Sequence, residues 1–496
     1  MGMVRRGWLA AALSLVFGGI LAWQLLLPHF IGLANNADFG KVSGWLSLAP
    51  PDSWNSNFLY FQPDYIRSQR DYWRSPYYSS ETVLAWLAVR LSRATTEGAH
   101  FDIRALGALH AALCIAAFWV MLVALGRAPV WRVCAAAGAA MVCFTDVCYT
   151  AYLNSFYMDA AALCGLLLLA ASAAWIAAAH EPSAGQFLLC GLAGLIYVTS
   201  KTQHAIWMLL PVVFVAAHSL RARSRPARLA GFAAGAILMA GGTGELATAD
   251  AGNRAQALFN KIFFQIANTG PDARADLREL GVRPEEFQYA GIHSYIPGSP
   301  ALDMQWIHQF YARTGYGRLL AWYLRHPSRA ARIMNDALVT DAPMMRPDNL
   351  SNFRREEGHP AGARTDRFAA WSDLRSALLA RWPYHIVLWY ALFTAGAIAT
   401  VRGRPHTPAS RVAWLGLGIA ALGIGHFLVA SLADCLETGR HLFPFHVCTD
   451  LTVCFAAAFF VRLKASDAKR SHFVLRDRRS LNGGRPPNCQ GVQRRQ

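Results

Sequence analysis

The stretch MDAAALCGLLLLAASAAWIAAA, residues 158–179, indicates the fold class of this chain. It carries one charged side chain, Asp159, near its start and is apolar over almost all of its remaining length. A helix of these 22 residues extends about 33 Å, and the hydrocarbon core of a bilayer is about 30 Å thick. The stretch therefore predicts a helix that crosses a membrane.

The composition extends this prediction to the whole chain. Of the 496 residues, 54% are hydrophobic and 16% are charged, and the mean hydropathy is +0.24, far from the average of soluble proteins. We therefore expect an all-α polytopic membrane protein. The net charge of +17 would suggest nucleic acid in a soluble protein, but here the basic residues collect in short loops between apolar stretches. We expect them to set the membrane topology, and we expect no nucleic-acid partner.

Nine further apolar stretches bring the predicted number of transmembrane helices to about ten. Several are shorter than the roughly 20 residues that a bilayer requires, so they are expected to extend into polar neighbours. Arginines precede the first stretch and fill the connections at 127–132, 221–228 and 401–411. All of these arginines lie on one side of the membrane if the N and C termini are both cytoplasmic. The nine stretches are residues 8–28, 105–125, 133–147, 186–199, 205–220, 229–246, 386–401, 412–432 and 447–461.

The first stretch and the cysteines allow simple interpretations. The apolar core of residues 8–28 is longer than the roughly 7 to 15 residues of a cleaved signal peptide, so we expect it to be retained. Seven of the ten cysteines lie within or beside apolar stretches, and no zinc-ligand spacing occurs. Cys148 and Cys435 lie in polar connections, and the sequence leaves open whether they form disulfides.

Two long connections, residues 30–102 and 247–384, are expected on the external side. The first contains an amphipathic segment at 81–94, predicted to be a helix in the membrane interface. The second shows several helical patterns and is predicted to form a mostly helical cap. The predicted organisation is a transmembrane module at 1–246, an external loop domain at 247–384, transmembrane helices at 385–462 and a basic, disordered cytoplasmic tail at 463–496.

Polar residues gather in four connections that this topology places outside: 35–41, 148–159, 199–204 and 433–446. Carboxylates there can accept a proton from a sugar hydroxyl or hold a metal, and cationic side chains can hold a phosphate. Each residue alone also has an ordinary explanation as a helix cap, a dipole partner or an interfacial anchor. Because all four connections are predicted on the same side of the membrane, together they favour a site for group transfer from a lipid phosphate. The charged candidates are Asp38, Lys41, Asp159, Lys201, His204, Glu437, Arg440 and His441.

The segments NNADFGK, YLNSFYMDAAAL, SKTQ and ETGRHLFPF, with a long first loop and many spans, resemble the C-type membrane glycosyltransferases (GT-C). More narrowly, they resemble bacterial hexose transferases of surface-glycan biosynthesis. This resemblance implies that Asp38 is the catalytic base and that the donor is a sugar on a polyprenyl phosphate. From their side of the membrane and their charge, we assign the other candidates to substrate binding. Lys41 lies beside the base, and Lys201, Arg440 and His441 are assigned to the donor phosphate. The sugar pocket is assigned Asn154, Tyr157 and Asp159, and the remaining substrate-binding candidates are Gln203, His204 and Glu437.

One departure from the family pattern concerns metals. Many GT-C enzymes carry two adjacent acidic residues in the first loop, whereas Asp38 stands between Ala37 and Phe39. A single base without a metal site is therefore expected, and no cofactor is certain. A second ligand from Asp159 or Glu437 leaves a divalent metal open.

The resemblance also implies a location and partners. We expect a multi-pass protein of the bacterial inner membrane whose site faces the periplasm or the exterior, acting on a glycan or glycolipid acceptor among membrane lipids. An O-antigen-type polymerase or ligase, which relies on external Arg and His, stays open as an alternative. So does a non-enzymatic lipid or glycan transporter, although the predicted spans carry few polar residues and no inverted repeat. The sugar, the acceptor, the stereochemical outcome and the oligomeric state are left open.

Overall fold

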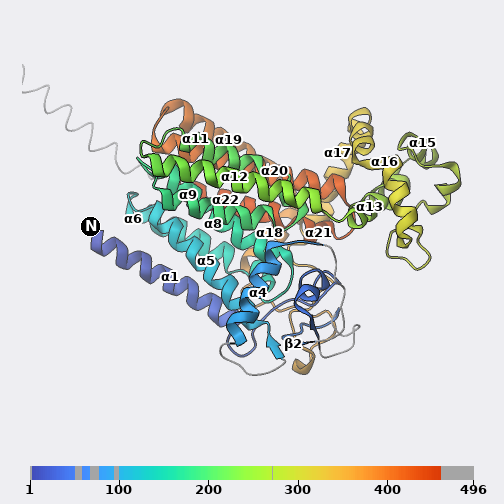
Figure 1. Ribbon diagram of the computed structural model, residues 1–496, viewed down its shortest axis with the longest axis horizontal. Coiled ribbons are helices and arrows are strands. Elements are labelled where there is room, and N and C mark those ends of the chain that lie inside the picture. Colours follow the sequence, from blue (N-terminus) through green and yellow to red (C-terminus); the bar gives the residue numbers. More distant parts are fainter. Residues whose placement is uncertain (1–2, 51–57, 68–76, 94–99, 271, 460–496) are drawn as a thin grey trace, which may run out of the picture. The chain divides into compact units, whose positions relative to one another are not determined.

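The computed structural model describes residues 3–50, 58–67, 77–93, 100–270 and 272–459, and the predicted cytoplasmic tail lies outside them. The described chain is mostly helical (Figure 1). Within it, six helices are long and apolar enough to cross a membrane. They are α1 (Met3–Leu25), α5 (Arg104–Ala124), α8 (Met158–Ala178), α12 (Arg225–Thr248), α19 (His385–Gly403) and α20 (Pro408–Ala433).

A seventh candidate span is bent. α6 (Val130–Phe144) and α7 (Val147–Leu153) meet at an angle of 67°. Asp146 at the bend caps α7, because its carboxylate accepts the backbone N–H of Cys148 at 2.9 Å. Three apolar helices are shorter: α9 (Ala184–Val198), α11 (Leu209–Ser219) and α22 (Phe443–Phe459).

The ten predicted stretches all fall on these helices, but their number as membrane spans stays a prediction. Among the described residues, six helices reach spanning length, or seven with the bent pair counted as one span. α11 has only 11 residues and extends about 16 Å, roughly half of the hydrocarbon thickness. Two short helices complete the connections between spans: α10 (Thr202–Ala205) and α21 (Thr438–His441).

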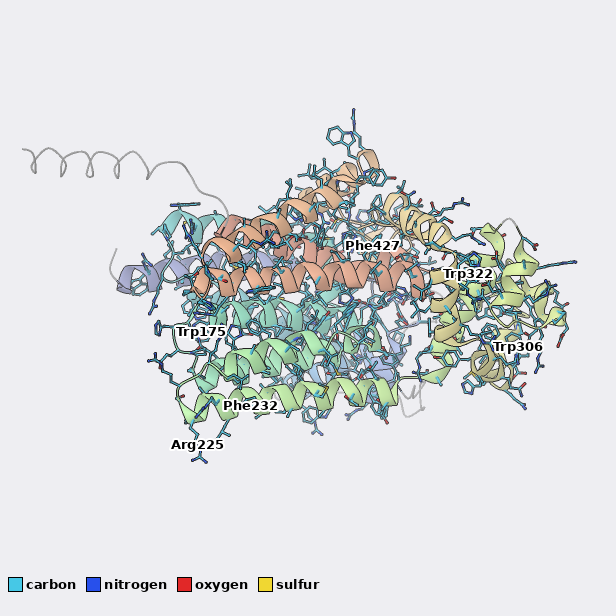
Figure 2. All side chains as sticks on the ribbon, turned by 90° about the horizontal axis from the view of Figure 1, so that it is seen from above. Trp175, Arg225, Phe232, Trp306, Trp322 and Phe427 are labelled. Carbon is cyan, nitrogen blue, oxygen red and sulfur yellow. The ribbon has the colours of Figure 1, made fainter. Side chains whose placement is uncertain are left out.

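The stretch that indicates the fold class, α8, is the central helix of the bundle. Of its most apolar 18 residues, 94% are buried inside the protein. The helix packs against α5, α9, α20 and α22 (Figure 1). Small residues allow the closest approach, because a Cβ on Gly165 would lie only 2.7 Å from the backbone nitrogen of Tyr197 on α9. Trp175 of α8 and Arg225 of α12 mark the same end of the helices in Figure 2.

The connection after α1 contains a small sheet that the sequence analysis did not predict. Its strands β1 (Leu48–Ala49), β2 (Asp64–Arg67) and β3 (His100–Asp102) pair antiparallel in that order. Strands of two to four residues are too short to leave an alternating pattern in the sequence. The same connection holds α2 (Gly40–Ser43) and a 3-10 turn, η1 (Gly44–Leu46).

The amphipathic segment predicted at 81–94 is a helix, α4 (Ser80–Arg93). Its expected apolar face is divided, since Leu84 is buried while the side chains of Val83 and Leu91 are 58% and 62% exposed. Leu84 packs into the protein, and the other two face outward as a helix at a lipid interface would require.

Residues 247–384 are mainly helical and contain a hydrophobic core of their own. Trp306 stacks on Phe310 with ring centroids 5.4 Å apart, and Trp322 is fully buried in the same core (Figure 2). The helices are α13 (Ala251–Phe259), α14 (Ala267–Thr269), α15 (Ala273–Glu279), α16 (Met304–Arg325), α17 (Pro327–Asp336) and α18 (Ala370–Arg381). Two π-helical segments, η2 (Asn260–Ile266) and η5 (Ala337–Asp341), and three 3-10 turns, η3 (Pro284–Tyr289), η4 (Pro300–Leu302) and η6 (Arg355–Glu357), join them.

Candidate active site

Charged side chains from the four polar connections meet at one end of the helix bundle. Asp38 forms ion pairs with Lys41 at 2.8 Å and with Arg440 at 2.7 Å. Arg440 also reaches the other two carboxylates of the group. We call the six charged residues the Asp38 cluster: Asp38, Lys41, Asp159, Lys201, Glu437 and Arg440.

Two asparagines shape the turn that presents Asp38. The side-chain oxygen of Asn36 accepts the backbone N–H of Asp38 at 3.3 Å, and that of Asn35 accepts the backbone N–H of Phe39 at 3.2 Å. Such side-chain bonds favour tight turns over a continuing helix. Ala37, between Asn36 and Asp38, has a φ of +81°, which is uncommon and strained for a residue other than glycine. The turn is thus held in a conformation that aims Asp38 at Arg440.

Arg440 is the centre of the cluster, placed by the short helix α21. Its Nε and Nη2 donate to Oε2 of Glu437 at 3.0 and 2.7 Å, and its guanidinium lies 5.3 Å from the centre of the Tyr157 ring. Its Nη1 lies 2.7 Å from Asp38 and 3.9 Å from Asp159 but makes no well-aligned hydrogen bond within the described chain. This nitrogen therefore keeps a donor available for a further anion.

Lys201 and Asp159 form the most deeply buried pair of the cluster. Nζ of Lys201 donates to both oxygens of Asp159 at 2.8 and 2.6 Å, and the two side chains are 9% and 1% exposed. Asp159 lies in the first turn of α8, where a carboxylate complements the helix dipole. Lys201 directly precedes α10.

The electrostatics of the cluster follow from its three cations and three carboxylates. Burial alone raises the pKa of Asp38, but the charges of Lys41, Arg440 and Lys201 outweigh it and bring that pKa far below its ordinary value. Burial also raises the pKa of Glu437, and Arg440 and the hydrogen bond from Asn36 reverse this to a net lowering. Burial lowers the pKa of Lys201, against the opposing charge of Asp159.

Tyr157, another predicted site residue, borders the cluster. Its hydroxyl donates to the backbone carbonyl of Ala34 at 3.2 Å, and its ring packs against Phe39. His441 follows Arg440 on α21, with its Nδ1 3.6 Å from Asp434. Burial lowers the pKa of His441, although Asp434 opposes this.

Three predicted residues lie apart from the cluster. The Asn154 amide donates to the carbonyls of Leu25 and Ile31, so it anchors the chain where α1 ends. His204 is buried, hydrogen-bonded to Ser200 at 2.7 Å and stacked on Tyr197. The side-chain nitrogen of Gln203 lies 3.2 Å from Nε2 of the same histidine.

A second polar group lies beside Lys41, and its carboxylate, Glu245, was not among the predicted site residues. Nζ of Lys41 lies 5.5 Å from the centre of the Tyr77 ring, and the Tyr77 hydroxyl accepts the backbone N–H of Thr202 at 3.2 Å. The Thr202 hydroxyl donates to Glu245 at 3.2 Å. Glu245 was a recognisable signal, because a carboxylate inside an apolar stretch marks a functional or paired position.

A buried ion pair between Arg375 and Asp450 was also missed. The pair measures 2.8 Å and joins α18 to α22. Tyr149 and Trp371 donate to the other oxygen of Asp450 at 2.6 and 3.1 Å. The carboxylate within the apolar stretch 447–461 was again the available signal.

The carboxylates of the Asp38 cluster are separated by cations. Among the described residues, no three His, Cys, Asp or Glu side chains lie together as ligands of a metal ion would. The arrangement can instead hold an anion between Arg440, Lys41 and Lys201 and offer a carboxylate to a neighbouring hydroxyl.

A comparison with known families identifies the membrane part of the chain. The family model of the YfdI N-terminal transmembrane domain matches residues 3–476, nearly the whole length. The chain belongs to the YfdI family. This YfdI-family chain is therefore a multi-pass membrane protein, and the membrane assignment first made from residues 158–179 is confirmed. No curated protein and no solved structure matches it.

The YfdI-family chain holds the Arg440 segment in place through a fully buried lysine, Lys261, on the π-helical segment η2. Its Nζ donates to the carbonyl of Ser431 in the last turn of α20, to that of Asp434 at the start of the connection that carries Arg440, and to Gln265. Burial lowers the pKa of Lys261 to about 8. π-Helical turns are frequent at functional sites, where they redirect a side chain.

Replacing Lys261 with methionine is expected to destabilise the folded protein, because the buried carbonyl of Ser431 loses its donor at about 1–3 kcal/mol and the partly buried carbonyl of Asp434 loses its donor as well. Thermal unfolding of the purified protein at pH 7.5 measures this, with Arg274→Met, an exposed position on α15, as the control. The unfolded chain binds more protons than the folded one between pH 8 and about 10.4, so Lys261 contributes stability that rises with pH in this window. A wild-type pH dependence that persists unchanged in Lys261→Met would contradict the assignment.

Proposed function

We propose that this YfdI-family protein is a membrane glycosyltransferase of the GT-C type. It moves a sugar, expected to be a hexose, from a polyprenyl phosphate to a glycan or glycolipid acceptor on the external face of the membrane. The observation that carries the proposal is the Asp38 cluster: three carboxylates and three cations, drawn from four connections, at one end of the membrane helices.

In the proposed reaction an acceptor hydroxyl oxygen attacks the anomeric carbon of the donor sugar. The bond between that carbon and the phosphate oxygen breaks, and its electron pair leaves on the polyprenyl phosphate. Asp38 takes the proton of the attacking hydroxyl. Arg440, Lys41 and Lys201 stabilise the negative charge that grows on the phosphate, an effect that is strongest in a site with little water.

In the cluster without donor, Asp38 is a weak base, and donor binding makes it a stronger one. While Asp38 is paired with Lys41 and Arg440, its lowered pKa weakens its attraction for a proton. Three cations and three carboxylates balance in charge, so a bound phosphodiester adds one net negative charge. The phosphate also competes with Asp38 for Arg440 and Lys41, and both effects raise the pKa of Asp38. In this scheme the donor activates the base.

The scheme predicts different pH profiles for kcat/KM and kcat. The first reports the free protein, so Asp38 stays ionised and causes no loss of kcat/KM down to about pH 4. The second, kcat, reports the donor complex, in which the pKa of Asp38 is raised. On acidification kcat should therefore be lost at a higher pH than kcat/KM. Initial rates in membrane vesicles between pH 4 and 8 measure both.

Lys41→Met provides the matched variant for the pH profiles. It removes a cation 2.8 Å from Asp38 while Arg440 stays, so the acid limb of kcat/KM should move to higher pH. If kcat/KM and kcat of the wild type were lost at the same acidic pH, activation of Asp38 by the donor would be contradicted.

A polymerase or ligase is the second candidate, because Arg440 and His441, the residue types on which such enzymes rely, adjoin each other here. Alanine substitutions separate the two candidates poorly, since Asp38 and Arg440 are partners and removing one disturbs the other. Asp38→Asn is better, because the amide oxygen still accepts a hydrogen bond. Full activity of Asp38→Asn together with an inactive Arg440→Lys would favour the polymerase or ligase.

A further inference from the structure

A second feature lies away from the Asp38 cluster, in a cleft of about 590 Å³ between α8, α11 and α20. Small residues leave this space open, among them Ala173 on α8, Ala217 on α11 and Gly418 on α20. A Cβ added to Gly418 would have no atom within 4 Å. The rest of the wall is almost wholly apolar, so the cleft suits hydrocarbon chains rather than a polar ligand.

The polar wall residues are confined to one end of the cleft: His218, Arg221 and Arg411. Arg411 donates to the carbonyls of Ala177 and Ala179 at the end of α8, at 2.9 and 2.7 Å, which fixes its position. Arg221 is exposed, and no ion pair of its side chain occurs within the described chain. An anion at this end would meet two guanidinium groups.

His218 supplies an independent observation that points to a ligand. Its Nδ1 donates to the carbonyl of Phe214 at 2.9 Å, and the side chain lines the cleft. The residue is only 9% exposed, yet Nε2 is buried with no hydrogen-bond partner among the described residues. A buried polar atom without a partner is costly, and because Nδ1 carries the proton of the neutral ring, Nε2 is an acceptor. A hydroxyl group of a bound molecule is therefore its expected partner.

The basic end of the cleft is the end farthest from the Asp38 cluster. Arg411 lies in the first turn of α20, whereas Asp434, at the cluster end, follows its last residue. The 26 residues of α20 extend about 39 Å, enough to separate the two sides of a membrane. α11, about 16 Å long, matches one leaflet of the hydrocarbon core, which is about 15 Å thick.

We propose that this cleft binds an anionic diacyl phospholipid of the bilayer. Its acyl chains lie along α11 and α20, its phosphate sits between Arg221 and Arg411, and a hydroxyl of its headgroup donates to Nε2 of His218. The arginine-rich connection 221–228 adds positive charge at the same level, as expected for the leaflet whose lipids carry negative charge. This site is separate from the donor site and does not depend on the proposed transfer reaction.

Native mass spectrometry of the delipidated full-length protein tests the site with two probes, dioleoyl phosphatidylglycerol and dioleoyl phosphatidylcholine. We expect one phosphatidylglycerol to bind at least tenfold more tightly than phosphatidylcholine. Gly418→Phe, which fills the cleft, should abolish the preference, while Gly138→Phe, another open glycine position, should keep it. Thermal unfolding of both variants confirms that they are folded.

Arg221→Gln keeps the test decisive if Gly418→Phe does not fold, because this exposed side chain is dispensable for packing. It should weaken phosphatidylglycerol binding about tenfold, whereas Arg223→Gln, at a residue paired with Glu181 outside the cleft, should not. Equal binding of the two lipids to the wild type, or unchanged selectivity in Arg221→Gln, would overturn the proposal. Displacement of phosphatidylglycerol by an equal concentration of polyprenyl phosphate would also overturn it, by assigning the cleft to the donor lipid.

Discussion

Asp38→Asn is expected to lower sugar transfer by about 10²- to 10⁴-fold, the usual contribution of a general base. The amide oxygen can still accept the hydrogen bond that Lys41 donates, and the bonds to the side chains of Asn35 and Asn36 keep the turn in place. What is lost is the ability to take the proton of the acceptor hydroxyl. Transfer of labelled sugar from a polyprenyl phosphate donor in vesicles measures the effect.

Asp102→Asn is the matched control for Asp38→Asn. Asp102 is a carboxylate of the same connection, paired with Arg104, but it lies at the edge of the small sheet, outside the Asp38 cluster. It should transfer sugar at nearly the wild-type rate. Binding of polyprenyl phosphate without sugar should be kept in Asp38→Asn, which separates loss of the base from loss of the donor site. Wild-type turnover by Asp38→Asn would remove Asp38 from the mechanism.

Lys201→Met is expected to reduce the free energy of unfolding by about 3–5 kcal/mol, because it leaves the buried Asp159 carboxylate without its closest partner. Arg440, at 3.9 Å from Asp159, compensates only in part. Thermal unfolding in detergent measures the loss. Lys41→Met is the control, since Lys41 is more exposed and its partner Asp38 keeps Arg440, so its effect on stability should be smaller.

The double variant Lys201→Met with Asp159→Asn separates stability from catalysis. It removes both charges, so most of the lost stability should return. Under the proposed function the transfer rate should not recover, because one of the cations that stabilise the leaving phosphate is gone. A stable double variant with wild-type transfer would show that Lys201 has only a structural role.

The sequence predicted the helices well because their signal is local. Apolar runs such as 158–179 report length and hydrophobicity directly, and each predicted stretch falls on a helix. The face of α4 was harder, since which of Leu84 and Val83 turns inward depends on the neighbouring elements rather than on spacing. The three-stranded sheet was not predicted, because strands of two to four residues leave no alternating pattern in the sequence.

The candidate site was predicted in part. Asp38, Lys41, Lys201 and Arg440 could be placed on one side from the order of spans and the basic loops. The structure brings Asp38, Lys41 and Arg440 into contact and places Lys201 beside them through Asp159. Asn154 was assigned to the sugar pocket from its position near a helix end, but its side chain holds the backbone after α1. Residues in the same connection can point in different directions, and spacing alone does not distinguish them.

By itself, the sequence determined that this chain is a helical membrane protein with polar residues gathered in a few connections. These properties depend on the free energy of transferring each segment from water to lipid, and that free energy is a sum over the residues of the segment. Only the tertiary structure decided which charges pair, such as Arg440 with Asp38 across some four hundred positions and Arg375 with Asp450. Pairing depends on distances of a few ångströms between segments, and these are set by how the helices pack rather than by any one of them.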